Sequence, residues 1–159
     1  MALWFADDQT FTLRSTATLV VWWATVIAIG HVGDSRAYLI AGGRVLQLTT
    51  DHAGSTNSDE DVVRLGHHPR PPEPQVRRLR VGDGDRVVLC TDGIWRHAST
   101  SDLMSCASLR PAEACQALRA NVPASHTEEA SVVVIEFSQR PAAVTGCEIA
   151  RGTTMVDRN

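Results

Sequence analysis

Residues 84–95, GDRVVLCTDGIW, place an acid and a glycine directly after a short apolar run. The run Arg86–Thr91 is rich in β-branched residues, which predicts a buried strand. Asp92 and Gly93 then end that strand abruptly. An aspartate-glycine pair is common in ordinary turns, and it can equally present a carboxylate at the edge of a sheet. The remainder of the sequence has to distinguish these two interpretations.

More strand patterns precede this segment. Arg14–Trp23 and Thr25–Val32 are branched and aromatic runs separated by a single residue, which predicts an antiparallel pair. In GDSRAYLIAGGRVLQLT, residues 33–49, the pair Gly42 and Gly43 joins two short runs. Because glycine tolerates positive φ, this pair predicts a tight hairpin. Together the four runs predict a meander.

The second half of the chain predicts a polar excursion, two strands, helices and a closing strand. Residues 51–75 are polar and carry prolines at 69, 71, 72 and 74. Grouped strands followed by helices indicate an α+β layered domain. The predicted elements are a short helix over Asp59–Leu65, strands at Gln75–Val81 and Arg86–Thr91, helices starting at Asp102 after a Ser101 cap and at Pro111, and a central strand over Ser131–Phe137.

Length and composition favour one globular domain. The chain has 159 residues, of which 43% are hydrophobic, enough for a substantial core. Its formal charge of -3 gives no indication of binding to nucleic acid or anionic lipid. The N-terminal residues lack the basic region of a signal peptide. The longest strongly apolar stretch, residues 18–32, carries no charge but is shorter than the ~20 residues that span a bilayer. We therefore expect a cytoplasmic chain with no membrane segment.

Histidines and cysteines suggest no metal centre by their spacing. The cysteines, Cys90, Cys106, Cys115 and Cys147, are too irregular for a zinc ribbon. Without a secretory signal, reduced thiols are expected. His67 and His68 are adjacent and cannot form a ligand pair one helical turn apart.

Five blocks of the sequence resemble one family, in order and approximate spacing. They are STATLVV (15–21), GHVGDSRAYLI (30–40), LTTDH (48–52), GDRVVLCTDGIW (84–95) and EEASVVVIEF (128–137). These blocks are similar to those of the metal-dependent type 2C (PPM) protein serine/threonine phosphatases. The resemblance covers Arg14 to Phe137. It implies an antiparallel β-sandwich flanked by helices, formed by residues 1–137, with 138–159 as a poorly ordered tail.

The resemblance also implies a site. Family members hold Mg or Mn ions with carboxylates at one end of the sandwich, and a metal-activated water hydrolyses phosphoserine or phosphothreonine. Hard cations of this kind prefer oxygen ligands. Asp92 resembles the family's metal-ligating acid, with Gly93 turning the backbone away from it, and Asp34 resembles an acid near an additional metal. Where the family has Asp-Asn before its last strand, this chain has Glu128 and Glu129, so Glu128 is the third candidate ligand.

The family's DGxGG segment, whose aspartate bridges two metals, has no match here. The resemblance therefore implies a sandwich truncated at its N-terminus, with weak or no activity as this chain alone. Three interpretations of function remain open. The first is an active phosphatase whose missing segment is supplied in trans or lost through a misassigned start codon. The second is a non-catalytic phosphatase-like module that binds a phosphoprotein or a signalling partner. The third is a decayed remnant that forms a homo-oligomer through an exposed sheet edge.

Several of these residues also have structural interpretations. Asp34 can cap a turn, Arg36 can pair with a local acid, and His52 can form a loop hydrogen bond. Trp22 and Trp23 are adjacent on a strand, so they must point to opposite faces. A group of arginines is expected to lie on a solvated strand face: Arg70, Arg77, Arg78, Arg80 and Arg86.

Overall fold

The computed structural model describes residues 14–52, 62–66, 72–125 and 129–138. These ranges contain seven strands and three helices, and none of the helices is long and apolar enough to cross a membrane. In chain order the elements are β1 (Ala17–Trp23), β2 (Val26–Val32), β3 (Arg36–Ala41), β4 (Arg44–Gln47), β5 (Gln75–Arg80), β6 (Arg86–Cys90), α1 (Asp92–Trp95), α2 (Thr100–Ser105), α3 (Pro111–Ala120) and β7 (Val132–Glu136).

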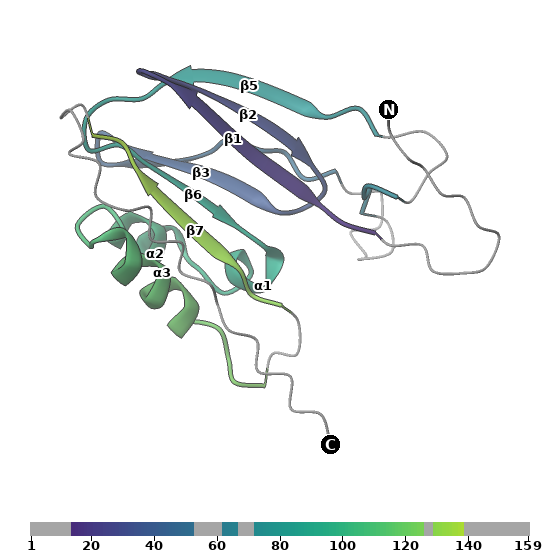
Figure 1. The fold of residues 1–159 in the computed structure, drawn as a ribbon. Helices are drawn as coiled ribbons and strands as arrows, with labels where there is room; N and C mark the ends of the chain where they lie inside the picture. The colour runs from purple at the N-terminus through teal and green to yellow at the C-terminus, as the bar shows by residue number, and fades with distance from the viewer. Residues whose placement is uncertain (1–13, 53–61, 67–71, 126–128, 139–159) are drawn as a thin grey trace.

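Two antiparallel sheets form a sandwich. One has the strand order β1-β2-β5 and the other β4-β3-β6-β7. Helices α2 and α3 lie on the outer side of the four-stranded sheet (Figure 1). This arrangement confirms the predicted α+β sandwich. The predicted meander is wrong, because β2 and β3 belong to different sheets and the chain crosses between them.

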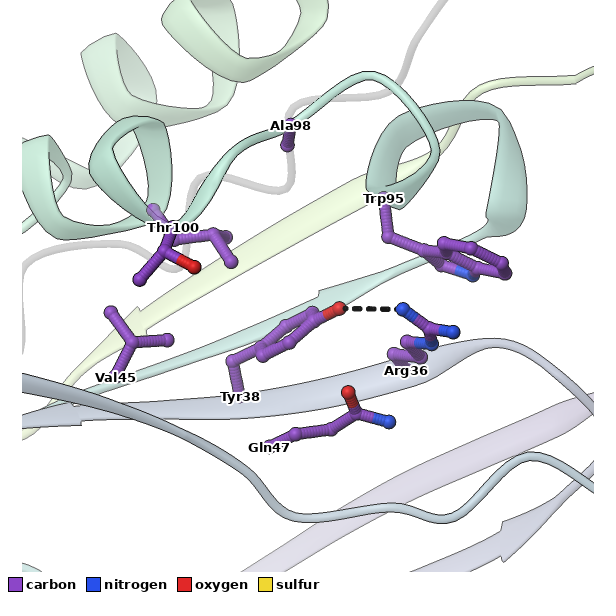
Figure 2. A pocket seen from close by; sticks show the side chains of 8 residues that line it. Arg36, Tyr38, Val45, Gln47, Trp95, Ala98 and Thr100 are labelled. Carbon is purple, nitrogen blue, oxygen red and sulfur yellow. Dashed lines mark hydrogen bonds between the residues drawn. The ribbon is translucent and has the colours of Figure 1, made fainter.

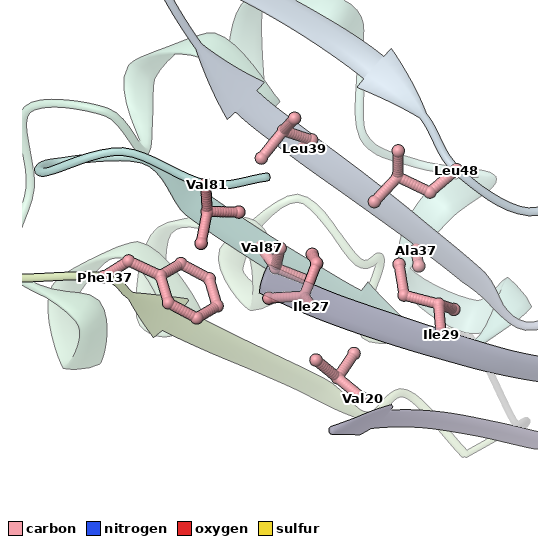
Figure 3. Packing of buried hydrophobic residues seen from close by; sticks show 9 residues of the cluster. All are labelled: Val20, Ile27, Ile29, Ala37, Leu39, Leu48, Val81, Val87 and Phe137. Atoms are coloured by element: carbon pink, nitrogen blue, oxygen red, sulfur yellow. The ribbon is translucent and has the colours of Figure 1, made fainter. Parts of the chain in front are cut away.

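The inner core fills the space between the two sheets (Figure 3). Strand side chains alternate between faces, so every second residue of β2 points inward. Ile27 and Ile29 of β2 are fully buried, for this reason. They pack with Val20, Ala37, Leu39, Leu48, Val81, Val87 and Phe137.

A second core lies between the four-stranded sheet and the helices. Strands β3 and β6 occupy the middle of that sheet and bury residues on both faces. This explains their nearly continuous apolar sequence, since a strand covered on both sides has no polar face. The cluster comprises Tyr38, Ile40, Val88, Cys90, Ile94, Leu103, Cys106, Ala114 and Leu118.

The helix starts follow the local sequence. Ser99, and not the predicted Ser101, caps α2, because the backbone N–H of Asp102 donates to its Oγ at 3.2 Å. The Asp102 carboxylate in turn accepts the Ser99 N–H at 2.8 Å, which completes a capping box. Pro111 is the first residue of α3, as predicted, at a position that needs no N–H donor.

Two other predictions fail. Strand β7 is an edge strand of the four-stranded sheet and not a central one. It is apolar because one face meets the inner core, where Ile135 packs, and the other meets the helices, where Val132 and Val134 pack. In the predicted helix over Asp59–Leu65, the described residues are not helical, and Leu65 forms a bridge with Ser15 instead. Residues 59–61 and the predicted tail from 139 onward lie outside the described ranges.

The arginines separate into two kinds. Arg77, Arg78 and Arg80 on β5 are exposed, as predicted. Arg70 lies outside the described residues. The prediction that Arg86 lies on a solvated face is wrong: it is 7% exposed, and its guanidinium reaches into the helical layer.

The buried Arg86 guanidinium ties the helical layer to the sheet. It donates to the main-chain carbonyls of Cys106 and Leu109, which follow α2. Its Nη2 also pairs with Glu136 Oε2 at 2.6 Å across the β6–β7 pair. Helix ends leave carbonyl groups without partners, so one buried cation here stabilises the connection between α2 and α3.

Replacing Arg86 with Gln is expected to lower the free energy of unfolding by roughly 3 kcal/mol, because charged hydrogen bonds to buried carbonyls are lost. Urea unfolding followed by tryptophan fluorescence measures this. The matched control Arg80→Gln, on an exposed position of β5, should change stability by less than about 0.5 kcal/mol. Equal losses in the two variants would contradict the structural role of Arg86.

Candidate metal site at the sandwich rim

Asp92 begins a helix directly at the end of a buried strand. Strand β6 ends at Cys90, Thr91 is extended, and α1 starts at Asp92. Gly93 is a buried helical residue and is not among the glycines with positive φ. The prediction that Gly93 turns the chain by its backbone freedom is therefore wrong. The Asp92 carboxylate accepts the Gly93 N–H at 2.9 Å, in the first helical turn, where negative charge is favourable.

Asp34 reaches the same rim from the connection between β2 and β3. In the antiparallel pair β3–β6, Arg36 lies opposite Cys90. Asp34 is two residues before Arg36 and Asp92 is two residues after Cys90, so the register brings both acids to one end of the sandwich. The indole Nε1 of Trp95 donates to the Asp34 carbonyl at 2.9 Å and joins the two segments directly.

Gly33 permits the tight turn before Asp34. Its φ is +112°, a conformation that other residues rarely adopt. A Cβ atom at this position would lie 2.4 Å from Thr16 Cγ2 on the neighbouring segment. The backbone directly after β2 therefore lies close to the residue directly before β1, next to Asp34.

The two acids influence one another electrostatically. Burial raises the pKa of the Asp34 carboxyl, the negative charge of Asp92 raises it further, and Arg64 opposes both effects. Asp92 is partly exposed, and its Oδ2 lies 3.5 Å from Nη2 of Arg96, one helical turn later. Two carboxylates that repel each other at a sheet end form an oxygen-rich position that a hard cation would stabilise.

A cluster of side chains surrounds the Arg36 guanidinium, and Figure 2 shows three of its members, Arg36, Tyr38 and Trp95. Arg36 binds the Asp51 carboxylate through Nε and Nη2 at 2.8–3.2 Å, which confirms the predicted pairing with a local acid. Its guanidinium carbon lies 3.4 Å above the centre of the Trp95 ring, and Nη1 donates to the Tyr38 hydroxyl at 3.4 Å. Neither Trp95 nor Asp51 is among the site residues predicted from the sequence, although both stand in the blocks that resemble the family.

A pocket of about 290 Å³ lies beside this cluster, between β3, β4 and α2. Its walls include Arg36, Tyr38 and Trp95 (Figure 2) but neither Asp34 nor Asp92. Asp34 and Asp92 therefore lie outside the pocket. Trp95 belongs to both places, because it lines the pocket and donates to the Asp34 carbonyl.

The rings of His31 and His52 lie next to each other, and His52 is hydrogen-bonded to Gly33, the residue before Asp34. The buried His31 ring shares a hydrogen bond with Thr18 Oγ1 at 3.0 Å, and its centre is 5.1 Å from that of His52. Its Nε2 has no hydrogen-bond partner of normal geometry within the described residues. Burial lowers the pKa of His31, and His52 lowers it further, against weaker opposing effects that include Asp51. The main-chain N–H of His52 donates to the Gly33 carbonyl at 2.7 Å, so the loop hydrogen bond at this position is made by the backbone.

Of the three predicted metal ligands, the structure brings Asp34 and Asp92 together. Glu128 lies outside the described residues. The next residue, Glu129, is anchored at the rim, because Thr91 Oγ1 donates to its carbonyl at 3.2 Å. Within the described ranges there is no group of three or more His, Cys, Asp or Glu side chains that could hold a metal ion. Among the described residues, Asp34 and Asp92 are therefore the two carboxylates that remain as candidate metal ligands.

Comparison with known proteins identifies the family. The family model described as protein phosphatase 2C matches residues 6–131. The chain belongs to the protein phosphatase 2C family. It is 28% identical over 98 residues to a probable protein phosphatase 2C of rice, Oryza sativa subsp. japonica, covering 57% of this chain. It is also 28% identical over 97 residues to the serine/threonine protein phosphatase PstP of Mycobacterium tuberculosis, covering 52% of this chain.

Solved phosphatases share the fold. A serine/threonine phosphatase of S. agalactiae superposes with a TM-score of 0.68 and 19% identity, covering 79% of this chain. The catalytic domain of PstP, solved in complex with two manganese ions, superposes with a TM-score of 0.59 and 22% identity over 76% of this chain. The two matches cover 60% and 57% of the solved chains, respectively. The chain spans only 14% and 19% of the length of the rice and PstP relatives.

Gly33→Ala is expected to destabilise the fold by roughly 3 kcal/mol or more, because backbone strain adds to a steric overlap with Thr16. The control is Gly42→Ala, where φ is +54° and no atom lies within 4 Å of the added Cβ. That change should cost only about 1–2 kcal/mol from backbone strain. Urea unfolding measures the free energy of unfolding of both variants. Equal losses would show that the overlap with Thr16 does not contribute.

Acidification is expected to destabilise the fold through His31. Its folded pKa lies below the ordinary value of 6.5, so the unfolded chain binds the proton first. The free energy of unfolding should fall as pH drops below about 6.5, by at most about 1.4 kcal/mol per pH unit from this group, until the folded pKa is reached. His31→Gln should flatten this slope in urea unfolding at several pH values. His97→Gln serves as the control and should preserve it; a slope unchanged in His31→Gln would disprove the assignment.

Proposed function

We propose that this chain contributes to metal-dependent hydrolysis of phosphoserine or phosphothreonine in proteins, with weak or no turnover by itself. The observation that carries this proposal is the convergence of Asp34 and Asp92, from different strand ends, on one rim of a protein phosphatase 2C fold. Burial and, after it, the nearby negative charge of Asp92 raise the pKa of Asp34, and cation binding would relieve the repulsion between the two carboxylates.

In this proposal Asp34 and Asp92 hold Mg or Mn through their carboxylate oxygens. A cation bound there would supply a water of lowered pKa for attack on phosphorus. Glu128 is proposed as a further ligand, supported by the attachment of its neighbour Glu129 to Thr91. The manganese complex of the PstP catalytic domain supports manganese as the first cation to test.

The remaining residues of the site have positioning roles. Trp95 holds the Asp34 backbone through its indole N–H, and the Arg36 guanidinium packs over the same ring. The bidentate Arg36–Asp51 pair fixes the guanidinium in place. Together these contacts restrict the movement of Asp34 relative to α1, which begins with Asp92.

Weak turnover is proposed because of the donor count. A pair of cations held as a clamp needs carboxylates from several strands. The described residues offer two, and the Glu128 side chain is one methylene longer than the aspartate of the family pattern. A displacement of ~1 Å can reduce a rate ~100-fold.

The second candidate function is a non-catalytic module that binds a phosphoprotein or a signalling partner. It is favoured by the same observation, that the described residues provide two carboxylates where a pair of metal ions needs more. Among the strands that the structure describes, β1 pairs only with β2, and an open outer edge of β1 could bind a partner strand or a second copy. A homo-oligomer through this edge therefore remains part of the second candidate.

Manganese titration separates the candidates. The chain is expected to bind about one Mn²⁺ and to hydrolyse p-nitrophenyl phosphate and a phosphoserine peptide slowly or not at all. Asp92→Asn and Asp34→Asn should each weaken Mn²⁺ binding by about tenfold or more, because affinity follows the charge of the ligand set. Binding is measured by calorimetry, and turnover by phosphate release.

Asp83→Asn is the matched control, since Asp83 lies in the turn before β6, at the opposite end of that strand from Asp92. It should leave Mn²⁺ binding unchanged. Two tightly bound ions with rapid turnover that Asp92→Asn abolishes would show a complete catalytic site. An absence of Mn²⁺ binding would refute the metal site and favour the non-catalytic module.

A further inference from the structure

Arg96 brings a positive charge to the rim that carries Asp34 and Asp92. It follows α1 as its C-cap residue, and its main-chain N–H donates to the Asp92 carbonyl at 3.0 Å. Residues four apart lie on the same face of a helix, so the two side chains can meet. Nη2 of Arg96 lies 3.5 Å from Oδ2 of Asp92. The single turn of residues 92–96 therefore places a guanidinium beside one of the two proposed metal ligands.

The Arg96–Asp92 pair is weak enough for another cation to displace it. Charge-assisted N–H···O bonds are typically about 2.7–2.9 Å long, so a separation of 3.5 Å indicates attraction between charges without a short hydrogen bond. The Arg96 side chain is 42% exposed and that of Asp92 is 24% exposed, so water screens the pair. The guanidinium therefore offsets part of the negative charge of Asp92 but does not hold the carboxylate firmly.

The two carboxylate oxygens of Asp92 have different partners. Oδ1 accepts the main-chain N–H of Gly93 at 2.9 Å, whereas Oδ2 faces Nη2 of Arg96. A divalent ion prefers an oxygen that no main-chain donor already uses, so Oδ2 is the better ligand atom. A guanidinium has N–H donors and no acceptor. Arg96 therefore cannot become a metal ligand itself, and next to Oδ2 it can only oppose an incoming cation.

Trp95 offers the Arg96 guanidinium a second partner. Cζ of Arg96 lies 5.3 Å from the centre of the indole ring, within the ~6 Å range of a cation–π interaction. Arg36 lies closer to the same ring, at 3.4 Å (Figure 2). When a divalent ion takes Oδ2 of Asp92, the Arg96 side chain can therefore remain against Trp95. Because arginine stays protonated in proteins, its charge opposes the ion at every pH at which the chain is folded.

Asp34 also has an arginine nearby. Burial and the charge of Asp92 raise the pKa of the Asp34 carboxyl, whereas Arg64 lowers it. Each acid of the rim is thus close to a cationic side chain of the same chain, Arg64 for Asp34 and Arg96 for Asp92. These arginines reduce the excess negative charge that would otherwise attract a divalent ion.

We propose that Arg96 sets the cation affinity of this rim, because its guanidinium and a divalent ion compete for Oδ2 of Asp92. The inference rests on the proposed function, in which Asp34 and Asp92 are the metal ligands. Binding of Mg or Mn requires the guanidinium to leave Asp92, and this exchange weakens the measured affinity. Arg96 is thus a second cause of weak turnover, in addition to the small number of carboxylates.

Manganese titration of Arg96 variants tests the competition in the full chain. Arg96→Gln should tighten Mn²⁺ binding by about fivefold, because it removes the competing charge from a partly exposed site. Arg96→Lys keeps the charge and should stay within about twofold of the parent chain. Arg96→Asp adds a carboxylate one turn after Asp92 and should tighten binding by at least about 30-fold, since affinity follows the charge of the ligand set. Calorimetry measures the affinities, and electron paramagnetic resonance of free Mn²⁺ measures the number of bound ions.

Arg110→Gln is the matched control. Arg110 pairs with Glu113 at the start of α3, so this substitution removes the same charge from another exposed ion pair. It should leave Mn²⁺ binding unchanged. A double-mutant cycle shows whether the effect passes through Asp92: in the Asp92→Asn background, Arg96→Gln should change Mn²⁺ binding by less than about twofold. Urea unfolding of each variant checks that the chain remains folded.

The possible failures of the two proposals are distinguishable. Mn²⁺ binding that Asp92→Asn weakens but Arg96→Gln leaves unchanged would overturn the role of Arg96 and preserve the metal site. The same conclusion would follow if the gain from Arg96→Gln persisted in the Asp92→Asn background, or if Arg110→Gln reproduced it, because the effect would then be one of general charge. An absence of Mn²⁺ binding in every variant, Arg96→Asp included, would refute the metal site and the role of Arg96 together.

Discussion

The antiparallel register of β3 and β6 is the constraint on which the rest of the structure depends. Both strands are buried on two faces, against the other sheet and against the helices, so a shift of one residue would exchange the two sets of buried side chains. The packing therefore fixes Arg36 opposite Cys90. Two residues beyond this pair, on either strand, lie Asp34 and Asp92. The position of the acids follows from hydrophobic packing rather than from any attraction between them.

The two acids occupy that position at an electrostatic cost, which the surrounding contacts offset. The Asp34 carboxyl is buried and close to Asp92, and both conditions disfavour its charge. Trp95 and the Arg36–Asp51 pair hold the backbone there through directed contacts. Sites in which unfavourable charge is maintained by the scaffold are typical of ligand-binding positions. The geometry around Asp34 and Asp92 therefore supports the proposed function in addition to family membership.

The helices attach to the four-stranded sheet through one buried cation as well as through apolar packing. They cover the outer side of that sheet, and Arg86 links the end of α2 to it with hydrogen bonds to main-chain carbonyls. Arg86 also pairs with Glu136 of β7. The same guanidinium therefore joins β6, β7 and the connection between α2 and α3.

The sequence by itself determined the elements that depend on local chemistry. Glycines at 42 and 43 predict the β3–β4 hairpin, Pro111 predicts the start of α3, and Asp92 is predicted at a strand end. Tertiary structure decided what depends on distant partners. Which strands share a sheet, why Arg86 is buried while Arg80 is exposed, and how Trp95 reaches Asp34 are set by contacts between residues far apart in the chain. Strand pairing and burial are properties of the packed molecule, and a local pattern carries no information about which distant segment will satisfy it.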